Sequence, residues 1–244
     1  MKDNFSKQAS AYARFRPGYP PKLIHDLAAL LPKCENAWDC ATGNGQIATM
    51  LSPYFKQVFA TDMSEKQLAQ AIAMPNIRYA KGIAEGSSFP DRYFDLITVG
   101  QAVYWFDAEK FNQEVKRVGE QRGIIAWIGY ALFKTHSPID EIIGHFYENI
   151  IGPYWDKERR HIDNKYASIP FPFDEIMMPQ YSMEYEWDFA AMTGYLRTWS
   201  AVQHYINTNG HDPVELIENN LKRYWGKHET VKIFIEIITR VGRI

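Results

Sequence analysis

The stretch from Asn36 to Ala48 combines an acidic side chain, Asp39, with two glycines, Gly43 and Gly45. A glycine has no Cβ, so the backbone N–H groups beside it can approach a ligand that a larger side chain would hold away. A carboxylate next to such a loop suits a ligand that carries an ammonium group. The stretch therefore predicts a small-molecule site, and a tight turn without a ligand is the alternative interpretation.

Two cofactors fit a glycine loop of this kind. Residues 43–48 match the dinucleotide pattern G-x-G-x-x-G/A, in which a pyrophosphate lies at a helix N-terminus. S-adenosylmethionine is the second, because its ammonium and sulfonium groups are both cationic. A carboxylate at Asp39 is unfavourable beside a pyrophosphate, so the residues favour S-adenosylmethionine. A nicotinamide-dependent oxidoreductase and a catalytically silent binding module remain the alternatives.

A second acidic residue supports a nucleotide site. Apolar residues predict buried strands over 36–40 and 57–61, and the second strand ends at Asp62. A carboxylate at this point of a nucleotide-binding sheet accepts both ribose hydroxyls, because its two oxygens match a vicinal diol. Residues 64–67 form a predicted capping box for the next helix, which leaves Asp62 available for the ribose.

The rest of the chain alternates predicted helices and strands, as in an α/β fold. The patterns predict a helix over 21–31, further strands over 76–80, within 88–102 and over 123–130, and late strands over 182–187 and 231–238. Helix starts are predicted at Asp107, Ser137-Pro138, Asp188 and Asp212-Pro213. We expect one domain, in which 1–20 caps the cofactor, 21–130 forms the cofactor-binding core, 131–228 is a substrate-side insertion with a late strand, and 229–244 is the final strand.

Residues 39–45 resemble motif I of the class I S-adenosylmethionine-dependent methyltransferases, D-x-G-x-G-x-G, with Ala41 at the first glycine. The resemblance implies a Rossmann-like sheet of seven strands with helices on both faces and a helical insertion late in the chain. It also implies a cofactor pocket, to which this part of the chain contributes Asp39, Ala41, Gly43, Gly45, Asp62 and Met63.

Other segments extend the resemblance. The opening around Tyr12 and Arg16 resembles a lead-in that folds over the cofactor in one subgroup, where Arg16 would meet the methionine carboxylate and Tyr12 would help to close the pocket. A solvated arm is the alternative. In the family, the position of Ala84 and Glu85 lies beside the adenine, and residues 88–102 resemble motif IV. Gln101 would therefore complete the cofactor pocket, with Tyr104 and Trp105 toward the acceptor.

The later half resembles the trans-aconitate methyltransferase-like branch at residues 152–155 and 195–201. This resemblance implies a small carboxylic acid as the methyl acceptor. An anionic oxygen needs no general base, so no catalytic residue is required. The protein would act by aligning the reactants and excluding water.

Arg197 is the candidate clamp for the acceptor, because a guanidinium binds a carboxylate through two parallel hydrogen bonds. A structural salt bridge is the alternative. Trp155, Trp199 and Tyr154 are interpreted as core residues rather than pocket residues. If the acceptor were a hydroxyl compound, His204 would be the candidate base.

Composition argues against several classes of partner. The net charge is −2 and no basic stripe is present, so we expect no nucleic acid. The loop at 100–104 lacks the N/D-P-P-Y/F sequence of amino-methyltransferases that act on bases, which leaves a small-molecule acceptor. The chain has two cysteines without metal-ligand spacing, no secretory signal and no apolar run that would span a bilayer. We expect no metal, no membrane and a cytoplasmic location; the oligomeric state is open.

Overall fold

A computed structural model describes residues 17–244, which form an α/β protein. The strands are β1 (Asn36–Cys40), β2 (Gln57–Asp62), β3 (Ile77–Lys81), β4 (Phe94–Gly100), β5 (Gly119–Tyr130), β6 (Asp174–Ile176), β7 (Tyr181–Trp187) and β8 (Val231–Arg243). The α-helices are α2 (Pro21–Ala29), α3 (Gln46–Leu51), α4 (Glu65–Leu68), α5 (Ala108–Val118), α6 (Ile139–His145), α7 (Arg160–Asp163), α8 (Phe189–Arg197), α9 (Ser200–Asn209) and α10 (Glu215–Trp225). Short helical turns are η2 (Val103–Trp105), η3 (Phe146–Ile150), η4 (Gly152–Tyr154) and η5 (Lys157–Arg159).

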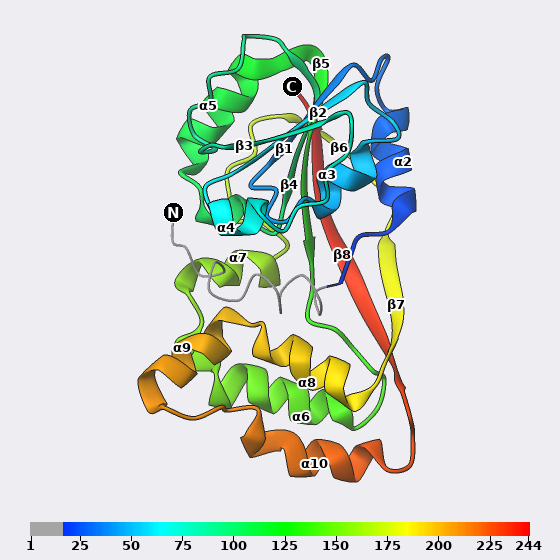
Figure 1. Ribbon diagram of the computed structural model, residues 1–244, viewed down its shortest axis with the longest axis vertical. Helices are drawn as coiled ribbons and strands as arrows, with labels where there is room; N and C mark the ends of the chain where they lie inside the picture. Colours follow the sequence, from blue (N-terminus) through cyan, green and yellow to red (C-terminus); the bar gives the residue numbers. More distant parts are fainter. Residues whose placement is uncertain (1–16) are drawn as a thin grey trace.

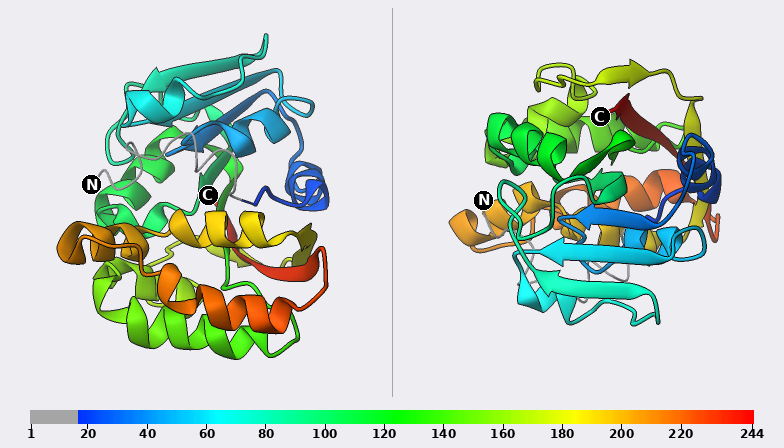
Figure 2. Two further views of the ribbon diagram at one scale, coloured as in Figure 1. Left: turned by 60° about the horizontal axis from the view of Figure 1, so that its bottom comes forward. Right: turned by 90° about the horizontal axis from the view of Figure 1, so that it is seen from above.

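One sheet organises the described part of the chain. Its strand order is β3-β2-β1-β4-β5-β8-β6, and β7 also pairs with β8. Strands β1 to β5 are parallel, whereas β8 is antiparallel to β5, β6 and β7 (Figures 1 and 2). The chain moves outward from β1 to β3 and then returns to β4 on the other side of β1. Ligands bind beyond the carboxyl ends of strands at such a reversal.

The sheet is covered on both faces because alternate residues of its buried strands point to opposite sides. Ala37 of β1 and Leu96 of β4 belong to a core that includes residues of α2 and α3. Their neighbours Trp38 and Ile97 belong to a second core that includes residues of α5. Figure 1 shows α5 on one side of the sheet and α2 and α3 on the other. The predicted fold class, with helices on both faces, is confirmed.

The helices that follow β5 form a layer of their own. Figure 1 shows α6, α8, α9 and α10 below the sheet; β7 leads from the sheet into this layer, and β8 leads from the layer back to the sheet. Tyr181–Trp187 pairs with the first part of β8, and Asp174–Ile176 pairs with the last part. The described sheet has eight strands rather than the predicted seven. The additional strand is β6, which was not predicted because three residues with a single apolar position give no periodic signal.

Most predicted helix starts are confirmed. Asp107 and Asp188 accept hydrogen bonds from the backbone N–H of Lys110 and Ala191, at 3.2 and 2.6 Å. The predicted start at Asp212-Pro213 is two residues early: α10 begins at Glu215, and Asp212 accepts a hydrogen bond from Val214 N at 2.9 Å within the preceding turn. Strand β8 extends to Arg243, whereas the predicted strand ended at 238. The last part was missed because its polar residues weaken the apolar pattern.

Candidate active site

Three residues with positive φ bend the loop between β1 and α3. Ala41, Gly43 and Gly45 have φ values of 55°, 58° and 83°. The left-handed conformation is unstrained only for glycine, so Ala41 adopts it at a cost of about 1 kcal/mol. A Cβ on Gly45 would lie 2.9 Å from Cε1 of Tyr79, whereas a Cβ on Gly43 would meet no atom within 4 Å. Gly45 is therefore required by packing, and Gly43 faces open space.

Asp39 lies beneath this loop and holds it in place. Its carboxylate accepts hydrogen bonds from the hydroxyl of Thr42, from the hydroxyl of Thr98 at 2.8 Å and from the backbone N–H of Ala48 at 3.1 Å. These donors belong to the loop, to β4 and to α3. Burial raises the pKa of Asp39 to about 6, and the three hydrogen bonds limit the rise.

Asp62 joins the end of β2 to the same loop. Its Oδ2 accepts a hydrogen bond from Gly43 N, and its Oδ1 accepts one from Ser64 N, each 2.8 Å long. Ser64 caps α4 by accepting a 3.3 Å hydrogen bond from Gln67 N, as predicted. The reciprocal half of the capping box differs, because the Ser64 N–H donates to Asp62. Met63 follows Asp62 and is half-buried.

The residues predicted beside an adenine lie after β3. Ala84 is buried at 2% exposure. Glu85 Oε1 accepts a 3.1 Å hydrogen bond from Asp107 N, at the start of α5. This contact fixes the loop after β3 against the loop after β4, so the two loops lie together at the carboxyl edge of the sheet.

A cavity opens between the glycine loop and the carboxyl ends of β1 and β4. It is lined by Tyr19, Asp39, Ala41, Thr42, Gly43, Asn44, Gln46, Ile47, Gly100, Gln101 and Tyr130. We call it the loop cavity. Four of the predicted cofactor residues line it, namely Asp39, Ala41, Gly43 and Gln101. Tyr12 and Arg16 lie outside the described residues.

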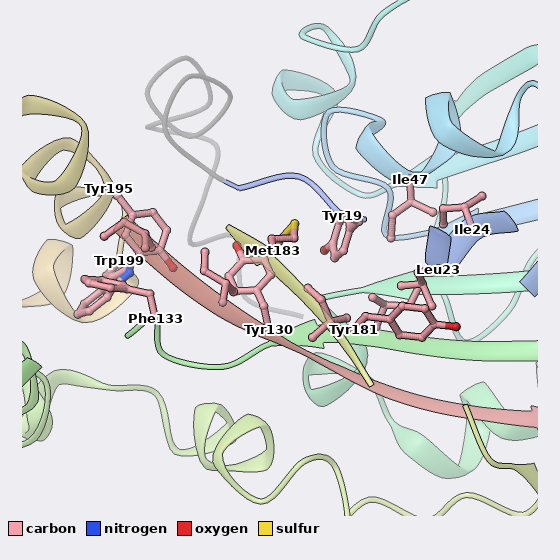
Figure 3. Close-up of a cluster of buried hydrophobic side chains, with 14 of the residues drawn as sticks. Tyr19, Leu23, Ile24, Ile47, Tyr130, Phe133, Tyr181, Met183, Tyr195 and Trp199 are labelled. Atoms are coloured by element: carbon pink, nitrogen blue, oxygen red, sulfur yellow. The ribbon is translucent and has the colours of Figure 1, made fainter. Parts of the chain in front are cut away.

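A second cavity lies between the sheet edge and the helical layer. It is lined by Gln101, Tyr104, Trp105, Tyr130, Ala131, Leu132, Trp155, Arg159, Ile162, Tyr195, Trp199 and Ser200. We call it the aromatic cavity. Gln101 and Tyr130 line both cavities, so the two are adjacent. Figure 3 shows Tyr130 between Tyr19, on the side of the loop cavity, and the pair Tyr195 and Trp199.

Gln101 is held in place at this junction by backbone contacts. Its φ of 56° turns the chain at the end of β4. Its N–H donates a 2.8 Å hydrogen bond to Ile128 O, and its side-chain Nε2 donates a 3.4 Å bond to Tyr130 O. A non-glycine residue in this conformation is uncommon and is typical of functional turns.

Aromatic side chains from both layers line the aromatic cavity. Tyr104 and Trp105 line it as predicted, with ring centroids 5.1 Å apart. Trp199 belongs to the hydrophobic core and Trp155 packs against it, as interpreted, and both also line the cavity, with ring centroids 5.7 Å apart. Tyr154 packs on Tyr205 instead, and His204 Nδ1 lies 2.9 Å from Tyr154 O.

The structure corrects the assignment of Arg197. Its Nε donates a 2.6 Å hydrogen bond to Asp212 Oδ2, and its Nη2 donates a 2.9 Å bond to Glu218 Oε1. These bonds tie the end of α8 to α10 and its preceding turn. Arg197 does not line either cavity among the described residues. A guanidinium already held by two carboxylates is a structural ion pair, which was the alternative interpretation.

Several residues that line the two cavities were not predicted as site residues. Tyr19, Gln46 and Tyr130 line the loop cavity, and Arg159 lines the aromatic cavity. Arg159 lies four residues after Trp155, but η5 begins only at Lys157 and Trp155 is extended, so no helical spacing in the sequence indicates their contact. Tyr130 was treated only as the end of a buried strand, although side chains at the carboxyl ends of parallel strands commonly reach the ligand.

Residues 17–244 contain neither a cluster of metal-binding side chains nor a membrane-spanning helix. No cluster of three or more His, Cys, Asp or Glu side chains in this part of the chain is arranged to hold a metal ion. Within the same residues, the helices are too short or too polar to cross a membrane.

Comparison with known proteins identifies the family. Residues 38–127 match the family model described as a methyltransferase domain. A protein of Dictyostelium discoideum, described as a methyltransferase, is 31% identical over 227 residues, which cover 91% of this chain and 86% of that protein. A methyltransferase of Mycobacterium tuberculosis is 29% identical over 183 residues, covering 74% of this chain and 70% of its own.

A solved structure agrees with the sequence relatives. The structure of a type II methyltransferase from Anaeromyxobacter dehalogenans has a TM-score of 0.87 and 34% identity, covering 94% of this chain and 98% of that one. The chain belongs to the class I S-adenosylmethionine-dependent methyltransferases. This membership decides between the two cofactors that the glycine loop allowed, in favour of S-adenosylmethionine.

Proposed function

We propose that this methyltransferase binds S-adenosylmethionine in the loop cavity and transfers its methyl group to a carboxylate oxygen of a small molecule bound in the aromatic cavity. The observation that carries the proposal is the wall shared by the two cavities, formed by Gln101 and Tyr130. A methyl group passes directly from donor to acceptor, so the two sites must meet. Residues 131–228 would then form the acceptor side of the domain.

The loop cavity fits the chemistry of the cofactor. A Cβ on Gly43 would meet no atom within 4 Å, so the space beside the loop is open. Asp39 lines the cavity and Asp62 accepts a hydrogen bond from Gly43 N at its edge, and the negative charge of these carboxylates matches an ammonium and a sulfonium. Asp62 would accept the ribose hydroxyls. Met63, Ala84 and Glu85 would surround the adenine, and Tyr12 and Arg16 would cover the methionine end.

When bound, S-adenosylmethionine supplies an electrophilic methyl group on a sulfonium. The chain contributes alignment and exclusion of water. A reaction between a cation and an anion cancels charge, so water that stabilises the separated charges slows it. Aromatic walls from Tyr104, Trp105 and Trp199 would remove that water. Holding donor and acceptor in line is worth about 7 kcal/mol at the low end of intramolecular comparisons.

Two observations support a carboxylate acceptor. Residues 152–155 and 195–201 resemble the trans-aconitate methyltransferase-like branch. In addition, a carboxylate is already anionic and needs no base, which agrees with the side chains that line the aromatic cavity. The described side chains that line the aromatic cavity include no His, Asp, Glu or Lys. A neutral hydroxyl acceptor loses its proton as it reacts, and apart from the tyrosines the described side chains of this wall offer no base for that step.

Two experiments test the proposal. Adding S-adenosylmethionine to the purified protein should raise its melting temperature, whereas NAD should not, because only a ligand of the folded state stabilises it. A turnover assay with labelled methyl donor over mono-, di- and tricarboxylic acids, alcohols and amines should give alkali-labile methyl esters from acids. Turnover confined to alcohols or amines would reject the carboxylate assignment.

A further inference from the structure

Arg159 brings a positive charge to the aromatic cavity. It is the last residue of η5 and lies directly before α7, in the helical layer that faces the sheet. It lines the aromatic cavity and does not line the loop cavity. Gln101 and Tyr130 line both cavities, so Arg159 belongs to the part of the aromatic cavity wall that the loop cavity does not share.

Aromatic rings hold the guanidinium of Arg159 in position. Its Cζ lies 5.3 Å from the ring centroid of Trp155 and 6.0 Å from that of Tyr147. The rings themselves are packed together, with centroids 5.0 Å apart. The side chain is only 18% exposed. Cation–π contacts of this kind stabilise a charge without satisfying its N–H donors.

One of those donors has no acceptor among the described residues. Nη1 of Arg159 is buried and makes no hydrogen bond. Its ion pair with Asp163 joins Nη1 and Oδ1 at 3.8 Å, which is too long for a hydrogen bond, and that Oδ1 already accepts a bond from Tyr147. A buried donor on a charged group without an acceptor is costly.

Three other arginines among the described residues, Arg117, Arg197 and Arg240, do not share this condition. Arg117 donates 2.7 Å hydrogen bonds to Glu114 and Asp91, and Arg197 is bonded to two carboxylates at 2.6 and 2.9 Å. Arg240 bonds Glu175 at 2.9 Å. The contrast indicates that the fold pairs its arginines closely where their role is structural. Arg159 differs, because its Nη1 makes no hydrogen bond and the residue lines a cavity.

We propose that Arg159 binds an anionic group of the methyl acceptor, at a distance from the atom that receives the methyl group. The proposal rests on the proposed function of the aromatic cavity as the acceptor site. A guanidinium bonded to the attacking oxygen would stabilise its negative charge and reduce its nucleophilicity. Arg159 is therefore a positioning residue: it binds a carboxylate, phosphate or sulfonate group that stays unchanged in the reaction.

The test uses two substitutions at Arg159 and one matched control. Arg159→Met keeps the length and apolar contacts of the side chain without its charge, and Arg159→Lys keeps the charge. Arg160→Met makes the same change at the next residue, which is exposed. Melting curves and calorimetry with S-adenosylmethionine establish that each variant folds and binds the cofactor. We expect cofactor affinity to stay within about two-fold of the parent protein in all three.

The first measurement is binding, followed by tryptophan fluorescence because Trp105, Trp155 and Trp199 line the cavity. The probes are aliphatic and aromatic dicarboxylic acids, each with its mono-amide, added in the presence of S-adenosylhomocysteine. The parent protein should bind at least one diacid more tightly than its mono-amide. Arg159→Met should weaken diacid binding by about 10- to 100-fold and abolish the preference. Arg159→Lys should recover part of it, and Arg160→Met should not change it.

The second measurement separates this proposal from the proposed function. For any acceptor that is turned over, Arg159→Met should raise KM and change kcat little. The methylated atom could instead be a hydroxyl oxygen or a nitrogen of an anionic acceptor whose KM depends on Arg159. That result would reject the carboxylate assignment and keep the role of Arg159. Three outcomes would overturn the role of Arg159. The first is that the parent protein binds no anion, the second is that it turns over neutral acceptors only, and the third is that Arg159→Met keeps the preference for a diacid over its mono-amide.

Discussion

The backbone N–H of Gly43 donates a 2.8 Å hydrogen bond to the carboxylate of Asp62, nineteen residues further along the chain. This bond joins the glycine loop after β1 to the end of β2. The other oxygen of Asp62 accepts the N–H of Ser64, which caps α4. One side chain thus orders both the loop that borders the cavity and the turn beside it.

Replacement of Asp62 by alanine should weaken S-adenosylmethionine binding by about 100-fold, because hydrogen bonds to a charged group contribute about 1.5–3 kcal/mol each. Calorimetry measures the change. Asp62→Asn should lose less, since the amide keeps one acceptor. Glu65→Ala, which removes only an exposed ion pair with Lys81, is the matched control and should bind normally. Parent-like affinity in Asp62→Ala would contradict the ribose assignment.

The two glycines should respond differently to alanine. Gly45→Ala combines a positive φ with a clash against Tyr79, so we expect a loss of about 2–4 kcal/mol in the free energy of unfolding and a melting temperature lower by about 5–10 °C. Gly43→Ala meets no atom, so its stability loss should be about 1–2 kcal/mol, while its Cβ enters the loop cavity and lowers cofactor affinity. Equal stability losses with equal affinities would refute this distinction.

Cofactor binding should depend on the protonation of Asp39. Its pKa in the folded protein is raised to about 6 by burial, from an ordinary value of 3.8. Between these values the folded state holds a proton that the unfolded state has lost, so this group lowers the free energy of unfolding as pH rises through that window. A cationic ligand nearby favours the ionised form, so S-adenosylmethionine affinity should rise from pH 5 to about pH 7 and then level off.

Calorimetry in buffers with different ionisation enthalpies would detect the proton that Asp39 releases on binding below pH 6. Asp39→Asn should remove this proton release and flatten the pH profile. Affinity that is already independent of pH in the parent protein would show that the ammonium does not interact with Asp39.

Arg197→Ala should act on stability rather than on the acceptor. Each of its two ion pairs is partly exposed, so we expect a loss of about 1 kcal/mol per pair and a melting temperature lower by about 2–4 °C for each kcal/mol. The Michaelis constant for the acceptor should stay the same in the folded variant. A selective rise in that constant would restore Arg197 as an acceptor contact and contradict its structural role.

The parallel half of the fold was predictable because its signals are local. Buried strands such as β1 and β4 are rich in apolar residues, and the glycine loop between β1 and α3 has a specific spacing. The Phe106–Phe111 contact, with ring centroids 4.8 Å apart, also follows from a short sequence interval. These features depend on residues close together in the chain, and the sequence therefore contains most of the information.

The acceptor side was less predictable because its contacts are distant in the chain. The pairing of Arg197 with Asp212 and Glu218 depends on how α8 packs against α10, which no periodicity reveals. Likewise, Trp155 and Trp199 have the composition of a core, and only the packing of η4 and α9 around a cavity distinguishes a wall from an interior. Residue type alone does not carry that difference.

Strand β8 follows the acceptor-side helices in the chain and pairs with β5, whose register partners include Ile124 with Arg243. The open edge of the parallel sheet is therefore covered only after the intervening helices have been synthesised. We expect strands β1 to β5 to form early from short-range contacts. We expect the pairing of β8 with β5 to be rate-limiting, because closing the long segment between these two strands costs entropy before their contacts form. Substitutions that slow the collapse of those helices would leave β5 exposed to neighbouring chains, and would lower the yield of protein by aggregation even where the finished enzyme is stable.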